Sequence, residues 1–197
     1  MRARKTTLII IFTLLASTFF FQGASAGSAP YDFGHLPLVL ETGDFVHRLE
    51  LDGTKMGDVV YTVEGPGLSF TTRLEAEFPA IAALGPRSIV AGAKFGVLRL
   101  YVFDGRGISS RILDDAASDP AVVVRGGYPV LVYRSTLTGV IHYAKLDWNG
   151  RVLDTGILGH EPGPVSRPKL LNGRILFSRA VDGGILERLY DYPAGQV

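Results

Sequence analysis

Two arginines occupy equivalent places in two similar stretches of the chain. Residues 130–150 read VLVYRSTLTGVIHYAKLDWNG, and residues 175–195, which lie 45 positions further on, read ILFSRAVDGGILERLYDYPAG. This offset superposes Arg134 on Arg179. A guanidinium group binds a carboxylate or a phosphate through parallel hydrogen bonds. The two arginines could therefore hold an acidic sugar or the carboxylates of a partner, or they could pair with acids of a neighbouring structural unit.

Further charged residues stand near the ends of other apolar runs. Lys94 and Glu41 take places similar to those of the two arginines in earlier parts of the chain. A second group lies in connecting segments and consists of Glu75, Glu77, Asp114, Asp115, Asp119, His160, Glu161 and Arg167. Two carboxylates about 5–10 Å apart can cleave a glycosidic bond, so a glycoside hydrolase or lyase is an alternative to a binding protein. We take Lys94, Asp119 and Glu161, together with the two arginines, as candidate ligand contacts.

The only tryptophan, Trp148, completes the set of candidate contacts. It precedes an Asn-Gly turn and could stack on a sugar ring or pack against a neighbouring unit. The histidines show no metal-binding spacing, and we expect His47 and His142 to lie at the surface, at equivalent places in two units. The chain has no cysteine, nucleophile elbow, phosphate-binding loop or dinucleotide fingerprint. The sequence therefore predicts no catalytic residue, metal or cofactor.

Strands must position these residues. In the segment VIHYAKL, residues 140–146, alternate side chains share a face, which is the period of a β-strand. No stretch of 12 residues has a convincing helical period, and the nearest one, TTRLEAEFPAIAAL, is interrupted by Pro79. Asp-Gly and Asn-Gly pairs between alternating segments are strong signals for β-hairpins. The chain is therefore predicted to be all-β.

The strands fall into about four repeats of roughly 45 residues, each expected to hold four antiparallel strands. Each repeat opens near a proline, with PYDFGHL, PAIAALG, PAVVVRG and RPKLLNG as the first segments. Its third strand closes at a glycine, which is Gly53, Gly105, Gly150 or Gly195. The last repeat ends after its third strand, and residues 27–29 are too short to supply a closing strand. We therefore expect an unpaired edge that a second copy of the chain could occupy.

This layout of PAVVVRG, LVYRS and GVIHYAKLDWNG resembles the blades of the β-propeller superfamily, in particular secreted propellers that handle glycans, such as sialidase-like and arabinanase-like enzymes and propeller lectins. The resemblance covers nearly all of residues 27–197. It implies that the hairpins between second and third strands and the connections between repeats lie on one face, where propellers bind ligands. It also implies that the Asp-Gly and Asn-Gly turns lie on the opposite face. A β-sandwich is the alternative fold.

The N-terminus has the layout of a secretory signal peptide. Arg2, Arg4 and Lys5 precede an apolar stretch from about residue 8 to residue 21, and Ala24 and Ala26 form a cleavage signature. We expect residues 1–26 to be removed and residues 27–197 to form one domain. Export without cysteine or an Asn-x-Ser/Thr site fits a bacterial periplasmic or secreted protein.

Charge excludes one class of partner. Of the 20 basic and 19 acidic residues, three basic ones lie in the signal peptide, so the mature chain has a formal charge of −2. A nucleic-acid partner is not expected, because no basic stripe remains. The sequence therefore predicts an exported, non-catalytic binding module for a glycan or an extracytoplasmic protein.

Overall fold

The computed structural model describes residues 27–28, 36–54, 58–117, 120–161, 168–171, 174–181 and 184–191. All regular structure in these residues is β-strand. In this described part, no helix is long and apolar enough to cross a membrane. The predicted all-β class is confirmed.

The strands form four antiparallel sheets that follow one another along the chain. The first sheet contains β2 (Leu38–Thr42), β3 (Phe45–Leu51), β4 (Val59–Gly65) and β5 (Leu68–Leu74). The second contains β6 (Glu77–Leu84), β7 (Arg87–Lys94), β8 (Val97–Phe103) and β9 (Ile108–Asp114), with β1 (Gly27–Ser28) paired to β6. The third contains β10 (Ala121–Arg125), β11 (Tyr128–Arg134), β12 (Val140–Leu146) and β13 (Val152–His160). The fourth contains β14 (Lys169–Leu171), β15 (Arg174–Val181) and β16 (Gly184–Tyr190).

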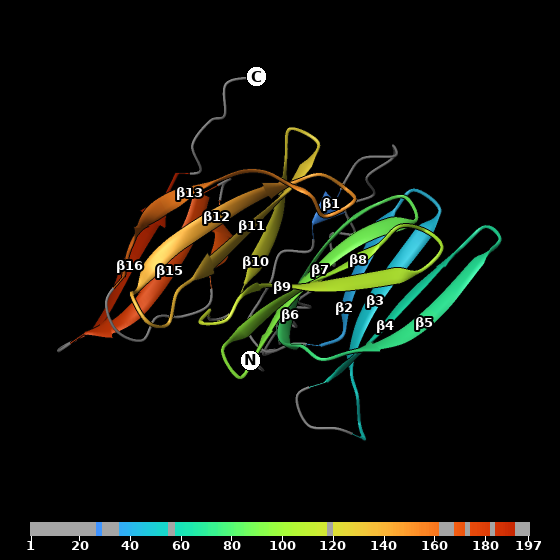
Figure 1. Ribbon diagram of the computed structural model, residues 1–197, viewed down its shortest axis with the longest axis horizontal. Coiled ribbons are helices and arrows are strands. Elements are labelled where there is room, and N and C mark those ends of the chain that lie inside the picture. Colours follow the sequence, from blue (N-terminus) through green and yellow to red (C-terminus); the bar gives the residue numbers. More distant parts are fainter. Residues whose placement is uncertain are drawn as a thin grey trace, which may run out of the picture.

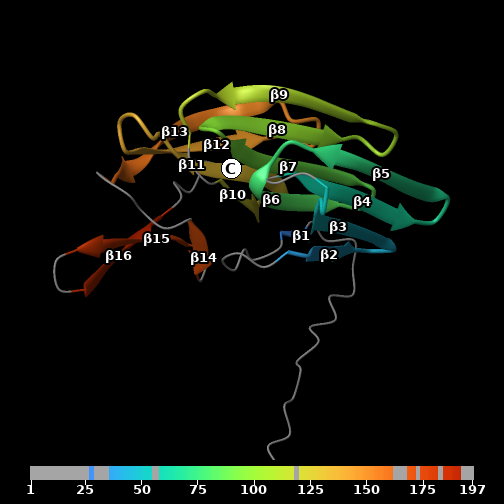
Figure 2. The same cartoon turned by 90° about the horizontal axis from the view of Figure 1, so that it is seen from below.

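The four sheets are arranged as a fan (Figures 1 and 2). In Figure 2 the first strands of the sheets, β2, β6, β10 and β14, gather near the middle, and the last strands, β5, β9, β13 and β16, lie outside. The first strands of neighbouring sheets contact one another, β2 with β6 and β6 with β10. Within the described residues no sheet closes on itself, and the apolar clusters join only sheets that are neighbours in the chain.

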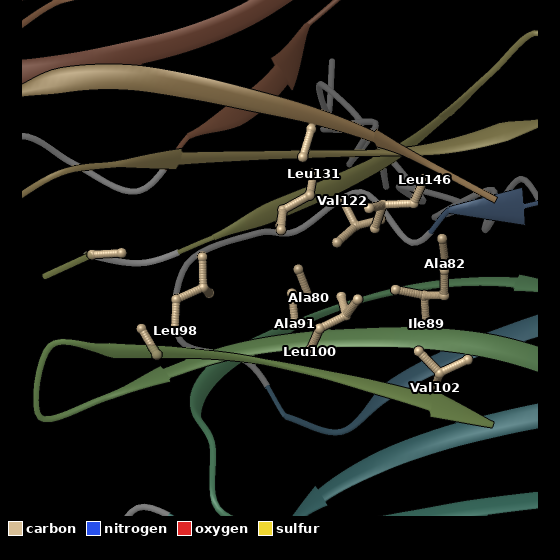
Figure 3. Packing of buried hydrophobic residues seen from close by; sticks show 13 residues of the cluster. Ala80, Ala82, Ile89, Ala91, Leu98, Leu100, Val102, Val122, Leu131 and Leu146 are labelled. Atoms are coloured by element: carbon tan, nitrogen blue, oxygen red, sulfur yellow. The ribbon is translucent and has the colours of Figure 1, made fainter. Parts of the chain in front are cut away.

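Three apolar clusters hold the fan together, one between each pair of neighbouring sheets. The middle cluster joins the second and third sheets, and in Figure 3 Ile89 and Leu100 lie across from Val122 and Leu131. Because the second and third sheets are covered on both sides, their inner strands contain continuous apolar runs, such as the buried residues 89–93 of β7. Burial of about 25 cal/mol per Å² of apolar surface is the main stabilising term in such a chain without disulfides.

The repeat seen in the sequence is a repeat of strand pairing. Arg134 lies opposite Ile141 in the pair β11 and β12, and Arg179 lies opposite Leu186 in the pair β15 and β16. A shift of 45 residues therefore relates the pairing of β11 with β12 to the pairing of β15 with β16. Asn149 and Gly150 lie in the turn between β12 and β13, as predicted, and Gly150 has a positive φ of 79°.

The first repeat differs from the prediction by one strand. The prediction places the first strand in PYDFGHL and closes the third strand at Gly53, whereas β2 is the first strand of this sheet and β3, which ends before Gly53, is its second. The segment LSFTTRL forms β5, the fourth strand. Most of the predicted first strand, PYDFGHL, lies outside the described residues. The prediction was wrong because it treated the Asp52-Gly53 pair as equivalent to the later turns. Gly53 lies between the second and third strands of its sheet, whereas Gly105 and Gly150 lie between third and fourth strands. Gly53 is therefore at the same end of the fan as Lys94, not at the opposite one.

The short segment after the predicted cleavage site also has a structural place. Gly27 and Ser28 pair with Ala83 and Ala82 of β6. This two-residue strand extends the second sheet, and it does not close the last one.

The prediction of a surface histidine is wrong for His47, which is fully buried between the first and second sheets. The shift by one strand places it in β3, on the face that meets the second sheet. Its Nε2–H donates to the carbonyl oxygen of Gly85 at 2.8 Å, and its Nδ1 accepts from the Tyr61 hydroxyl at 2.8 Å. Tyr61 in turn contacts the Ser88 hydroxyl at 2.7 Å. This chain of hydrogen bonds links the two sheets, and the burial of the ring favours the neutral imidazole.

His47 makes the stability of the fold depend on pH. Burial lowers the pKa of His47 below its usual 6.5, so the unfolded chain takes up a proton at a higher pH than the folded protein does. The free energy of unfolding should therefore be highest above pH 6.5 and fall by up to about 1.4 kcal/mol per pH unit below it, until the folded imidazole is protonated too. Urea denaturation at pH 7.5 and 5.0 measures this fall. The His47→Gln variant keeps a donor and an acceptor but should show a smaller difference between the two pH values; an equal difference would contradict this role.

Candidate functional site

One end of the fan collects the segments that the sequence singled out. Its described residues are those of the β7–β8 turn at Phe95 and Gly96, the β11–β12 hairpin at residues 135–139, the connection after β5, and the described parts of the β3–β4 loop and of the connections after β9 and β13. We call this the hairpin end. The turns that contain Gly105 and Gly150 lie at the opposite end.

A relay of main-chain hydrogen bonds crosses the hairpin end from the second sheet to the third. The Ala117 amide donates to the Gly96 carbonyl at 2.7 Å, and the Thr136 amide donates to the Ala116 carbonyl at 2.6 Å. Ala117 also forms an isolated bridge with Ser135. The connection after β9 is thereby fastened to the hairpins on both sides of it. Loops held in this way form a rigid surface, whereas most loops are the mobile part of a domain.

The relay continues to Glu161, the residue that follows β13. The Glu161 amide donates to the Gly139 carbonyl at 2.8 Å, and its own carbonyl accepts from Arg134 Nε at 2.9 Å. No side chain fits at Gly139, because a Cβ atom there would lie 2.6 Å from the Glu161 carbonyl oxygen and its φ is +73°. These main-chain contacts hold the backbone of Glu161 in place without any contribution from its side chain.

The carboxylate of Glu161 is buried and surrounded by groups of the fourth sheet. Its Oε2 lies 3.8 Å from Arg179 Nε, and its Oε1 lies 3.4 Å from an Arg188 nitrogen and accepts a short hydrogen bond from the Tyr190 hydroxyl. Burial, followed by the hydrogen bond to Glu161, raises the pKa of Tyr190. Burial lowers the pKa of Arg134. We call Arg134, Glu161, Arg179, Arg188 and Tyr190 the Glu161 cluster; it joins the third sheet to the fourth.

Three of the predicted contacts therefore come together: Arg134, Arg179 and Glu161. The sequence left open whether the arginines bind a ligand or pair with an acid of a neighbouring unit. The observed ion pair of Arg179 with Glu161 is of the second kind. Arg188 and Tyr190 were not predicted. The 45-residue offset aligns them with Tyr143 and Lys145 and gives no sign that they meet Glu161.

Lys94 makes a similar contact between the first and second sheets. Its ammonium group forms a short ion pair with Asp58, which follows the β3–β4 loop. This hydrogen bond raises the pKa of Lys94, and Glu75 and Glu77 raise it further by their charge. Glu75 and Glu77 thus lie near Lys94, as the prediction of one common end requires.

The other two predicted contacts are not part of this group. Trp148 lies in the β12–β13 turn at the opposite end, where its indole N–H donates to the Gly127 carbonyl at 2.8 Å and its ring packs on the middle apolar cluster. This is the packing role that the sequence left open. Asp119 lies outside the described residues.

Three acids of the described residues, Asp104, Asp147 and Glu161, make contacts that stabilise the local structure. Asp104 and Asp147 each accept two main-chain N–H groups of their own turns, and Glu161 is held by cations. The described residues contain no group of three or more His, Asp or Glu side chains that could hold a metal ion.

Two exposed apolar side chains of the hairpin end were missed by the sequence analysis. Phe95 is 87% exposed at the tip of the β7–β8 turn, and Leu137 is 83% exposed at the tip of the β11–β12 hairpin. Phe95 has a positive φ of 53°, which is unusual for a bulky residue. The available signal was the Phe-Gly pair between two alternating segments, where a tight turn favours Asn or Gly at the first position.

No protein-family model matches the chain, and no curated protein matches it either. Its function is therefore inferred from the residues and the geometry described above.

The Glu161 cluster should contribute to stability more than an exposed acid does. Replacing Glu161 by glutamine leaves Arg179 and Arg188 without their shared carboxylate, and loss of one partner of a buried ion pair costs about 3–5 kcal/mol, less where a partner is partly exposed as Arg188 is. We expect Glu161→Gln to lower the free energy of unfolding by about 2 kcal/mol in urea denaturation. The matched control is Glu75→Gln in the connection after β5, whose side chain is exposed. Equal effects of the two substitutions would contradict the role of the cluster.

Proposed function

We propose that the protein is an exported, non-catalytic binding module with a propeller-like arrangement of four sheets, and that its hairpin end recognises the ligand, a glycan or an extracytoplasmic protein. The observation that carries the proposal is Phe95, a strained and exposed aromatic residue on a rigid surface. Export is supported by the signal-peptide layout of residues 1–26. The propeller-like arrangement is supported by the fan of sheets around their first strands (Figure 2).

Phe95 is unfavourable for the fold by itself. A non-glycine residue in the left-handed region costs about 1–2 kcal/mol, and glycine would avoid this cost. The Phe95 ring gains little burial in return, since it is 87% exposed. The Lys94 ammonium group lies over the Phe95 ring, 5.6 Å from the ring centre. Strained residues of this kind concentrate at ligand sites.

The surroundings of Phe95 suit binding. The Ala117 and Thr136 hydrogen bonds fasten its turn to the hairpin that carries Leu137, so both exposed side chains sit on a surface that loses little entropy when a ligand binds. An aromatic ring can stack on a sugar or fill a pocket of a protein partner. The ion pairs of Lys94 and Arg179 then act as supports of this surface and not as the first contacts.

The alternative of a glycoside hydrolase has less support. Such an enzyme needs two carboxylates that flank the bond to be cleaved. Glu161, the most buried acid of the hairpin end, is surrounded by arginines and the Tyr190 hydroxyl. An acid held in this way is suited to structure.

The test separates binding from folding at one position. We expect Phe95→Gly to stabilise the mature chain by about 0.5–1 kcal/mol, because the relieved strain exceeds the entropy cost of glycine, and to lose ligand binding. Phe95→Tyr, which keeps the aromatic ring, should keep binding. Stability is measured by urea denaturation, and glycan binding is measured on a broad glycan array with all three proteins.

A protein ligand is sought by photocrosslinking in the exporting cell, with a benzophenone amino acid at position 95. The control position is Ile112, an exposed apolar residue of β9, away from the hairpin tips. A specific array signal that Phe95→Gly loses, or a discrete adduct from position 95 and none from position 112, supports the proposal. No array signal together with identical crosslinking patterns from the two positions would overturn it.

A further inference from the structure

The fourth sheet has an edge that differs from the edges of the other three. In each of those sheets the third strand pairs with a fourth, β4 with β5, β8 with β9 and β12 with β13. Among the described strands, β16 is the third strand of its sheet and pairs only with β15. The strand therefore presents a row of main-chain N–H and C=O groups to any segment that can add to the sheet.

Apart from the charges of Glu187 and Arg188, β16 lacks the irregular pairing and polar rows of the other outer strands. The outer strands β9 and β13 contain irregularities in their pairing with β8 and β12, and β5 has a polar exposed row of Ser69, Thr71 and Arg73. The pairing of β15 with β16 runs through seven consecutive pairs without a shift. On the face turned away from the third sheet, Ile185 is 73% exposed and Leu189 is 43% exposed. A regular edge with exposed apolar side chains is suited to strand addition.

Two charges on β16 restrict what can pair with it. Glu187 is exposed on the same outer face as Ile185 and Leu189. Arg188 points to the other face, where it reaches the Glu161 carboxylate at 3.4 Å, and its side chain is 49% exposed. An added strand would place one residue opposite each of them, and opposite charges across a strand pair are favourable whereas like charges are not.

The same rule disfavours the second copy of the chain that the sequence suggested as an occupant. Two antiparallel copies related by a two-fold axis keep each face of the sheet continuous. The register that pairs the whole of β16 with its copy, from Gly184 to Tyr190, then places Glu187 opposite Glu187. A shift by one residue along each strand in one direction places Arg188 opposite Arg188, and the shift in the other direction pairs only Gly184 to Arg188 and places Glu187 opposite the apolar Ile185.

We infer that the edge of β16 binds an extended segment of a partner protein by strand addition, with an acidic residue opposite Arg188, a basic residue opposite Glu187 and apolar residues opposite Ile185 and Leu189. In an antiparallel pairing the segment reads, from its N-terminus, apolar, acidic, basic, apolar, apolar. This surface is separate from Phe95, so it adds to the proposed function and does not rest on it.

Capped synthetic peptides test the inference with the mature chain. The first peptide carries Thr, Val, Glu, Lys, Val, Val and Thr in that order, and the second has Glu in place of Lys. By fluorescence anisotropy the wild-type protein should bind the first peptide about 3- to 10-fold more tightly than the second. The Glu187→Lys variant, altered at an exposed site, should reverse this preference.

A backbone control separates strand addition from other binding. N-methyl groups are placed on alternate residues of the first peptide, in two complementary sets, so that one set blocks the amides that face β16. Only that set should abolish binding. Absence of binding at millimolar peptide, equal effects of the two sets, or an unchanged preference in Glu187→Lys would overturn the inference. A dimer of the wild-type chain in sedimentation experiments that the peptide does not dissociate would also overturn it, since the edge would belong to a second copy.

Discussion

The structure depends on the burial of both faces of its second and third sheets. With no cysteine in the chain, the stability of the domain comes from apolar surface buried between neighbouring sheets and from strand pairing. Small residues allow the sheets to approach closely: Ala80, Ala82 and Ala91 of the second sheet lie in the middle cluster. Because a sheet buried on both sides needs a neighbour on each, the four sheets must follow one another as a fan.

The two ends of the fan meet this constraint differently. The outer face of the first sheet is mostly polar, with Arg48, Glu50 and Glu64 exposed beside the apolar Val39. The outer face of the fourth sheet exposes two apolar side chains, Ile185 and Leu189, together with Glu187. Polar side chains at the edges of the sheets also fix how neighbouring sheets are placed. His47 forms hydrogen bonds between the first sheet and the second, and Glu161 forms ion pairs between the third and the fourth.

The sequence predicts well what depends on local pattern. Alternation in VIHYAKL and the Asn149-Gly150 pair identify strands and a hairpin, and the offset of 45 residues identifies a repeated register. The frame of the first repeat was wrong, because Asp52-Gly53 has the same local signature as the Asn149-Gly150 turn but occupies a different place in its sheet.

The candidate site was harder to predict, because the role of each residue depends on which side chains the fold brings next to it. Glu75 and Glu161 look alike in the sequence, and only the fourth sheet, which brings Arg179 and Arg188 to Glu161, makes one of them a buried anchor. The burial of His47 depends on which strand of its sheet carries it. Phe95 was missed because an exposed aromatic side chain is recognised from its φ and its exposure, neither of which is a property of local sequence.

The central claim is that the hairpin end is a rigid surface built from main-chain hydrogen bonds between sheets. Amide hydrogen exchange measured by NMR tests it most directly, at Ala117, Thr136 and Glu161, whose N–H groups bond to a neighbouring loop or hairpin. These amides should exchange as slowly as that of Val132 in the core strand β11. Exchange at the rate of an unprotected loop at all three positions, with Val132 still protected, would contradict the claim.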